Sequence, residues 1–137
     1  MKHTKLLIFF VLFTFHFQAK CQNRCNCDTI YDFTDEMPVY KTGNESLLTY
    51  LISDIAPAIK KCMKEDAYKI SSLRMILTIN KKGKVTDVEF LRPDLPIICK
   101  KELLKTLRKM KGWKAGRLNG QVVCTHFSWP VSCIKWD

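Results

Sequence analysis

The sequence has few histidines, few acidic residues and few glycines, and these shortages exclude several classes of function. Its 137 residues include 3 His, 5 Gly and 13 Asp or Glu, against 23 Lys or Arg. It contains no glycine-rich loop that could cradle a phosphate group, and no paired-carboxylate motif of the kind used in general acid–base catalysis. We therefore expect a protein that is not an enzyme and that holds no cofactor.

The sequence also lacks an apolar run long enough to cross a bilayer, which needs about 20 residues. Its longest run, residues 6–17, is an almost unbroken apolar run of 12 residues that follows two lysines. This pattern is typical of a signal peptide, and a buried helix is the alternative. Small residues at Ala19 and Cys21 predict cleavage after Cys21, which removes residues 1–21. Attachment of a lipid to Cys21 is the other interpretation.

Export would change the charge and the histidine content. Removing Lys2, Lys5 and Lys20 and no acids leaves 20 basic against 13 acidic residues, a net charge of +7, with His126 as the remaining histidine. Basic surfaces attract polyanions, but export separates this one from nucleic acid. An alternative function is therefore peripheral association with anionic envelope lipid or polysaccharide, through Lys60, Lys61, Lys64, Lys100, Lys101, Lys105, Lys109, Lys111 and Lys114.

The cysteines indicate disulfides rather than a metal site. Six would remain after export, an even number: Cys25, Cys27, Cys62, Cys99, Cys124 and Cys133. Exported domains form disulfides because their compartment is oxidising, and six cysteines allow 15 connectivities. Structural zinc sites usually space their cysteines two to four residues apart and use four ligands, so we assign the close pair at Cys25 and Cys27 to disulfides and expect no metal.

Cys124 and His126 lie two residues apart on one face of a predicted strand. A nucleophilic cysteine needs such a histidine nearby. Two ordinary solvent-facing residues explain the spacing equally well, and we favour that interpretation.

Hydrophobic periodicity predicts two helices and three strands after a short, poorly structured lead-in over residues 22–43. Leu47, Leu48, Leu51, Ile52 and Ile55 predict a helix over 44–56, with Asn44 as its N-cap and Pro57 ending it. Alternation predicts strands over 73–80 and 85–91, joined by a turn with positive φ at Gly83. Cys99, Leu103, Leu107 and Met110 form one face of a second helix, which Asp94 would cap and Gly112 would end.

The last element is a strand over 121–129. Pro130 cannot donate to a strand ladder, so it either closes this strand or sits at a sheet edge. The order of elements predicts an α+β domain over 44–137, in which two helices cover one face of a small, three-stranded antiparallel sheet. If both helices pack on that face, Cys62 and Cys99 could approach each other. We therefore predict a disulfide between these two residues.

Several spaced motifs resemble the C-terminal domain of TonB-type energy transducers over residues 36–131. They are "NKKGKVTDVEFLRPD" for the hairpin, "ELLKTLRKMKGWKAGRLNGQVV" for the second helix and the segment after it, and "FSWPV" for the closing strand. A full transducer has an uncleaved membrane anchor and a long proline-rich segment, whereas this lead-in has about 22 residues. The resemblance therefore implies a free-standing exported domain of the periplasm or envelope.

The resemblance also implies a binding function, because family members pair their last strand with an extended segment of an outer-membrane receptor. The expected binding strand carries Val122, Cys124, His126 and Ser128. Trp113, Phe127 and Trp129 would anchor the other face of this strand and its surroundings in the core. The same edge could also pair two copies of the chain as a homodimer.

Overall fold

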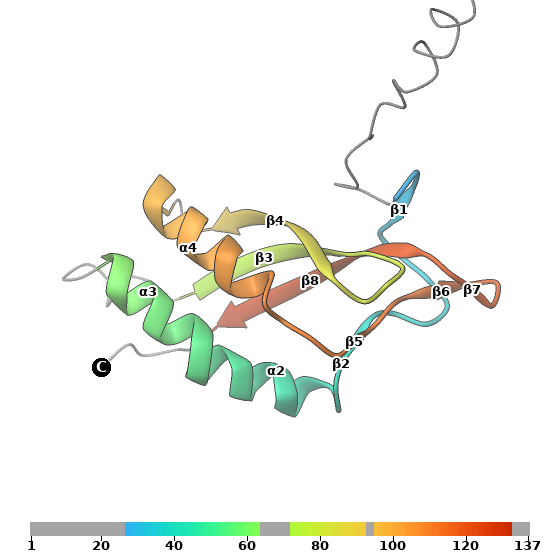
Figure 1. Ribbon diagram of the computed structural model, residues 1–137, viewed down its shortest axis with the longest axis horizontal. Helices are drawn as coiled ribbons and strands as arrows, with labels where there is room; N and C mark the ends of the chain where they lie inside the picture. The colour runs from blue at the N-terminus through green and yellow to red at the C-terminus, as the bar shows by residue number, and fades with distance from the viewer. Residues whose placement is uncertain (1–26, 64–71, 93–94, 133–137) are drawn as a thin grey trace, which may run out of the picture.

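The computed structural model describes residues 27–63, 72–92 and 95–132. The predicted signal peptide, Cys21, Cys25, Lys64, Asp94 and Cys133 lie outside these residues. The described chain is an α+β structure in which the helices lie on one face of a four-stranded sheet (Figure 1). No helix in the described part of the chain is long and apolar enough to span a membrane.

The main sheet has the strand order β1-β8-β3-β4. Its strands are β1 (Ile30–Tyr31), β3 (Ser72–Ile79), β4 (Val85–Arg92) and β8 (Cys124–Ser132). β3 pairs antiparallel with both β4 and β8, which agrees with the three-stranded antiparallel sheet that the sequence predicts. The prediction missed β1, which adds a fourth strand parallel to β8. Two residues are too short a segment to show a strand period in the sequence.

The turn between β3 and β4 is fixed by backbone geometry and by one side chain. Gly83 has a φ of 67°, as predicted, and a Cβ there would collide with the backbone oxygen of Trp113. The Oδ1 atom of Asn80 accepts hydrogen bonds from the backbone amides of Lys82 and Lys84, each at 3.0 Å. These bonds satisfy amides that the tight turn leaves outside the strand ladder.

The first helix is longer than the sequence predicts. It consists of α2 (Asn44–Tyr50), a π-helical turn η2 (Leu51–Ile55) and α3 (Ala56–Met63). Pro57 does not end it, because the π turn widens the helix just before the proline, and the amide of Ala56 donates to the carbonyl of Leu51. The wider turn leaves room for the proline ring, which would otherwise clash with a carbonyl four residues earlier. The N-cap is Gly43 rather than Asn44, and it makes no side-chain cap bond.

The second helix, α4 (Ile97–Leu107), buries the face that the sequence predicts. Cys99, Leu103 and Leu107 are completely buried. The helix begins after Pro96 and ends five residues before Gly112, which was the predicted end. The chain instead leaves the helix through two short turns, in which the amides of Lys109 and Met110 donate to carbonyls three residues earlier.

From residue 27 onward, the predicted lead-in is part of the fold rather than a poorly structured segment. Within it, β2 (Val39–Tyr40) pairs antiparallel with β5 (Trp113–Lys114). Tyr40 is 2% exposed, and its ring lies 5.2 Å from that of Trp113. Burial of this large aromatic side chain gives a physical reason for the lead-in to pack on the domain.

The predicted strand over 121–129 is divided between β7 and β8, and Pro130 does not close it, because β8 continues through this residue to Ser132. β6 (Arg117–Leu118) and β7 (Gln121–Val122) form a small hairpin, and its turn residues Asn119 and Gly120 both have positive φ. Such a pair is typical of a two-residue hairpin turn. The chain then passes Val123, whose amide donates to the carbonyl of Gly116, and continues as β8.

Candidate binding edge

The candidate functional site is the outer edge of β8, the side that faces away from β3. β3 pairs with eight consecutive residues of β8, from Thr125 to Ser132, without a register shift. On the other side, β1 pairs with β8 at Cys124 and Thr125. Among the residues that the structure describes, no strand pairs with this outer side beyond Thr125. We call the outer side of residues 126–132 the open edge.

The direction of each amide on β8 follows from Pro130. The amides of successive strand residues point alternately to the two sides of a strand. Pro130 lies opposite Arg74 of β3 and has no amide hydrogen to donate to it. If the hydrogen-bond ladder between β8 and β3 is unbroken, it therefore uses the backbone amides and carbonyls of the odd-numbered residues of β8. The amide and carbonyl of Ser128 point to the open edge, where Pro130 offers a carbonyl alone.

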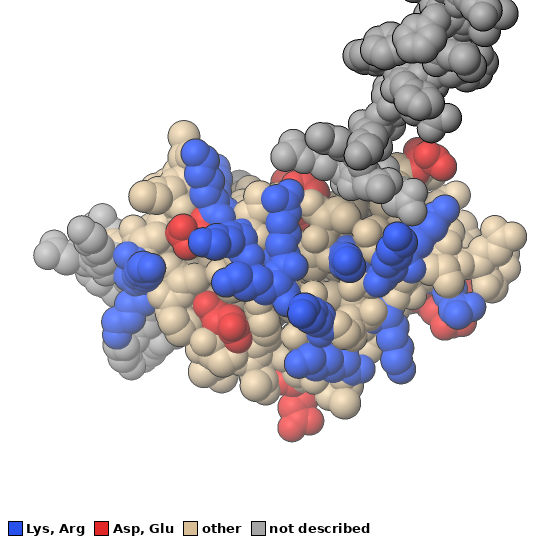
Figure 2. Space-filling view, viewed as in Figure 1, with Lys and Arg blue, Asp and Glu red and all other residues tan. Residues whose placement is uncertain are grey.

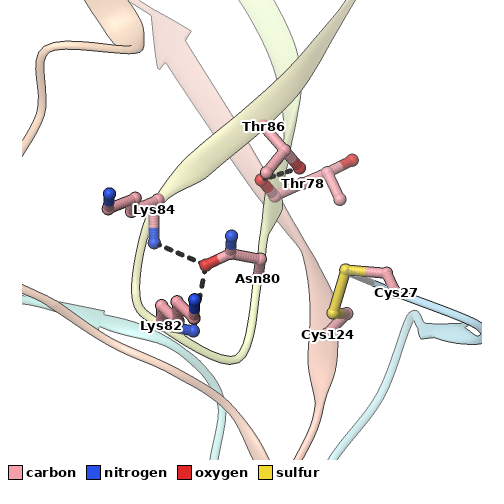
Figure 3. Close-up of a disulfide and its surroundings, with 7 residues drawn as sticks. All are labelled: Cys27, Thr78, Asn80, Lys82, Lys84, Thr86 and Cys124. Atoms are coloured by element: carbon pink, nitrogen blue, oxygen red, sulfur yellow. Dashed lines mark hydrogen bonds between the residues drawn. A yellow bond between two sulfur atoms is a disulfide. The ribbon is translucent and has the colours of Figure 1, made fainter. Parts of the chain in front are cut away.

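A disulfide holds β1 against the start of β8. Cys27 and Cys124 are bonded, with their Cα atoms 5.8 Å apart, next to the β3–β4 turn (Figure 3). The sequence predicts that the Cys124 side chain faces solvent, and that expectation is wrong because Cys124 is completely buried. Its bond to Cys27 also means that the Cys124–His126 pair has no free thiol.

His126, another expected binding residue, contacts the segment that follows β1. Its Nδ1 atom lies 2.7 Å from Oδ1 of Asp32. The His126 side chain is 35% exposed and that of Asp32 is 74% exposed. Asp32 therefore extends the contact between the lead-in and β8 by one residue beyond the two paired positions.

The other expected residues divide between the open edge and the hairpin. Ser128 is exposed on the open edge, as expected. Val122 belongs to β7, where it pairs with Arg117, and so lies outside the edge. The anchors Trp113 and Trp129 are 6% and 7% exposed and belong to the core. Phe127 is partly buried, and its ring packs 5.0 Å from that of Trp113.

Two exposed apolar side chains on the first helix were missed as site residues. The sequence places Leu48 and Ile52 on the apolar face of that helix, but they are 55% and 64% exposed. Tyr50 donates to the Thr106 carbonyl of α4, which marks the side of the helix that faces α4. At 100° per residue, Leu48 and Ile52 lie on the opposite side. Figure 1 shows that α2 and α3 lie on the β8 side of the sheet, whereas α4 lies on the β4 side.

The other sheet edge, on β4, is protected against strand addition. The β3–β4 register shifts twice, between Arg74 and Met75 and between Thr78 and Ile79. Arg108 of α4 donates to the carbonyl of Thr86 at 3.0 Å. Irregular pairing and charged side chains are the usual means of discouraging edge pairing. The eight regular pairs of β8 show neither feature, and Pro130 is the device of this kind that the described part of its open edge carries.

The chain was compared with protein-family models, with curated proteins and with solved structures. No family model, no curated protein and no solved structure matches it.

Proposed function

We propose that this protein is a non-catalytic binding module that takes up an extended segment of an envelope protein along the open edge of β8. The observation that carries the proposal is the one-sided pairing of β8 beyond Thr125 among the described residues. An unpaired edge binds a peptide through main-chain hydrogen bonds, and alternate side chains give selectivity.

The surroundings of the edge favour an apolar segment. A strand added beside β8 would direct every second side chain toward the helices. On that side it would meet Leu48 and Ile52, which are exposed and apolar. On the other face it would meet Ser128 and Pro130, which are uncharged. We expect a partner segment with apolar residues at alternate positions and few charges.

The resemblance of the sequence to TonB-type C-terminal domains suggests what that partner is. Members of that family pair their last strand with a segment of an outer-membrane receptor, and β8 is the last strand described here. Such a receptor, or a related envelope protein, is the partner class that we propose.

The disulfides are consistent with this location. The structure contains Cys27–Cys124 and also Cys62–Cys99, the pair predicted from the sequence. Disulfides persist in oxidising compartments, so the two bonds indicate an exported protein. The periplasm is the compartment that we propose.

Substitution of Ser128 tests the proposal. Ser128→Pro removes an amide from the open edge and should leave the β3 ladder intact, because this amide points away from β3. Ser128→Ala is the matched control, since it removes the hydroxyl and keeps the amide. The immobilised variants would be incubated with envelope extract of the native host, and the captured proteins identified by mass spectrometry.

We expect the wild type and Ser128→Ala to capture the same outer-membrane protein and Ser128→Pro to lose most of it. Circular dichroism would show that all three are folded. If folded Ser128→Pro captures the same protein as strongly as the wild type, strand addition at this edge is wrong.

A further inference from the structure

A second surface lies at the other end of the helices, where α4 begins. Ile97 and Ile98 occupy the first turn of α4 and are 72% and 65% exposed. The two side chains are adjacent, so they form a small apolar patch, and contiguous exposed apolar patches can mark interaction sites. We call this pair the isoleucine tip.

Lysines follow the isoleucine tip on α4 and lie near the end of α3, the helix that a disulfide joins to α4. The Cys62–Cys99 disulfide joins α3 to α4, and the Cα atoms of these two cysteines lie 5.3 Å apart. Lysines flank each of the bonded cysteines within two residues in the sequence: Lys60, Lys61, Lys100 and Lys101. Figure 2 shows that Lys and Arg side chains gather on the helix-bearing face, with few acidic side chains among them.

We propose that this end of the molecule docks on an anionic phospholipid surface, with the isoleucine tip in the acyl–headgroup boundary and the lysines on the headgroups. Peripheral membrane proteins bind through two contributions, the burial of apolar side chains and the attraction of basic side chains to anionic lipid. The surface is separate from the open edge of β8, so the inference does not depend on the proposed function.

Other occupants fit these residues less well. A polysaccharide or another polyanion would neutralise the lysines but would leave Ile97 and Ile98 in water. A second copy of the chain would cover the isoleucines, but it would bring two lysine-rich surfaces together, and like charges repel. An anionic bilayer satisfies the apolar and the charged groups at the same time.

Vesicle co-sedimentation tests the proposal. The probes are vesicles of equal parts phosphatidylglycerol and phosphatidylcholine, and vesicles of phosphatidylcholine alone. The wild type should bind the first kind and not the second, and added salt should weaken the binding. Ile97→Gln/Ile98→Gln should weaken partitioning at least tenfold, whereas Ile98→Trp should strengthen it because tryptophan favours the membrane interface.

The lysines are tested with a charge-matched control. Each lysine near an anionic surface contributes roughly a fivefold change in partitioning, so Lys60→Gln/Lys61→Gln/Lys101→Gln should weaken it by roughly a hundredfold. The control, Lys81→Gln/Lys82→Gln/Lys84→Gln, removes the same charge from the β3–β4 turn at the opposite end of the sheet (Figure 1). It should stay within roughly fivefold of the wild type.

Four results would overturn the inference. They are no binding to the anionic vesicles, equal loss in both triple variants, unchanged binding of the isoleucine variant, and a monomer–dimer equilibrium that responds to the isoleucine substitutions in sedimentation velocity. The third would point to a polyanion such as polysaccharide, and the fourth to a second copy of the chain.

Discussion

Thr125 of β8 is completely buried, and its Oγ1 atom has no hydrogen-bond partner in the described part of the chain. A buried hydroxyl without a partner costs about 1–3 kcal/mol of folding free energy. Thr125→Val replaces this hydroxyl with a methyl group and keeps the β-branched shape that suits a strand. We therefore expect the substitution to stabilise the protein by about 1–3 kcal/mol, although most single substitutions destabilise.

The assay is urea unfolding followed by circular dichroism, with both disulfides intact. A gain of 1 kcal/mol should also raise the Tm by roughly 4 °C. Thr106→Val is the control, because the hydroxyl of Thr106 donates to the Glu102 carbonyl at 2.9 Å and its loss should cost about 0.5–1.5 kcal/mol. If Thr125→Val destabilises the protein as Thr106→Val does, the Thr125 hydroxyl is satisfied and the reasoning fails.

Three further predictions concern other parts of the fold. Burial, and then the charge of Asp54, raise the pKa of Tyr50 to about 12. The neutral phenol therefore stabilises the fold fully below pH 10, and this contribution is lost as the pH rises through about 12. Tyr50→Phe should remove this loss, which would be measured as a flatter plot of urea-unfolding free energy against pH between 10 and 12. Cys62→Ser/Cys99→Ser opens a loop with a sequence separation of 37 and should cost about 4 kcal/mol in the chain-entropy model, measured by urea unfolding. Gly83→Ala should lower the Tm by several degrees in a thermal melt, because the new Cβ collides with a β5 backbone oxygen and the residue keeps a positive φ, a strain of about 1–3 kcal/mol.

The elements with a regular hydrophobic period could be predicted from the sequence. Leu73, Met75 and Leu77 alternate along β3, and all three are buried on the helix side of the sheet. Periods of this kind are local, so they need no knowledge of the rest of the chain. The positive φ at Gly83 is local in the same sense, because a short glycine-bearing loop between two strands restricts the turn.

The features that the sequence did not reveal depend on distant contacts. β1 has two residues, and its place beside β8 depends on a disulfide between residues 97 positions apart. Six cysteines leave 15 pairings, so the Cys27–Cys124 bond could not be chosen in advance. The exposure of Leu48 and Ile52 was missed for a related reason. A helical period shows that a stripe is apolar, but it does not show how wide a stripe the sheet covers.

The clamp formed by β1 limits what the open edge can bind. β1 pairs with the outer side of β8 up to Thr125, and the His126–Asp32 side-chain contact takes up the first residue of the open edge. The six residues that follow, 127–132, span roughly 20 Å at 3.3 Å per residue. Within that length, Pro130 supplies an acceptor but no donor. A partner strand would therefore form few main-chain bonds, and much of its affinity would have to come from side chains that reach Leu48 and Ile52. The composition of the partner segment, rather than its backbone, is then what distinguishes one envelope protein from another.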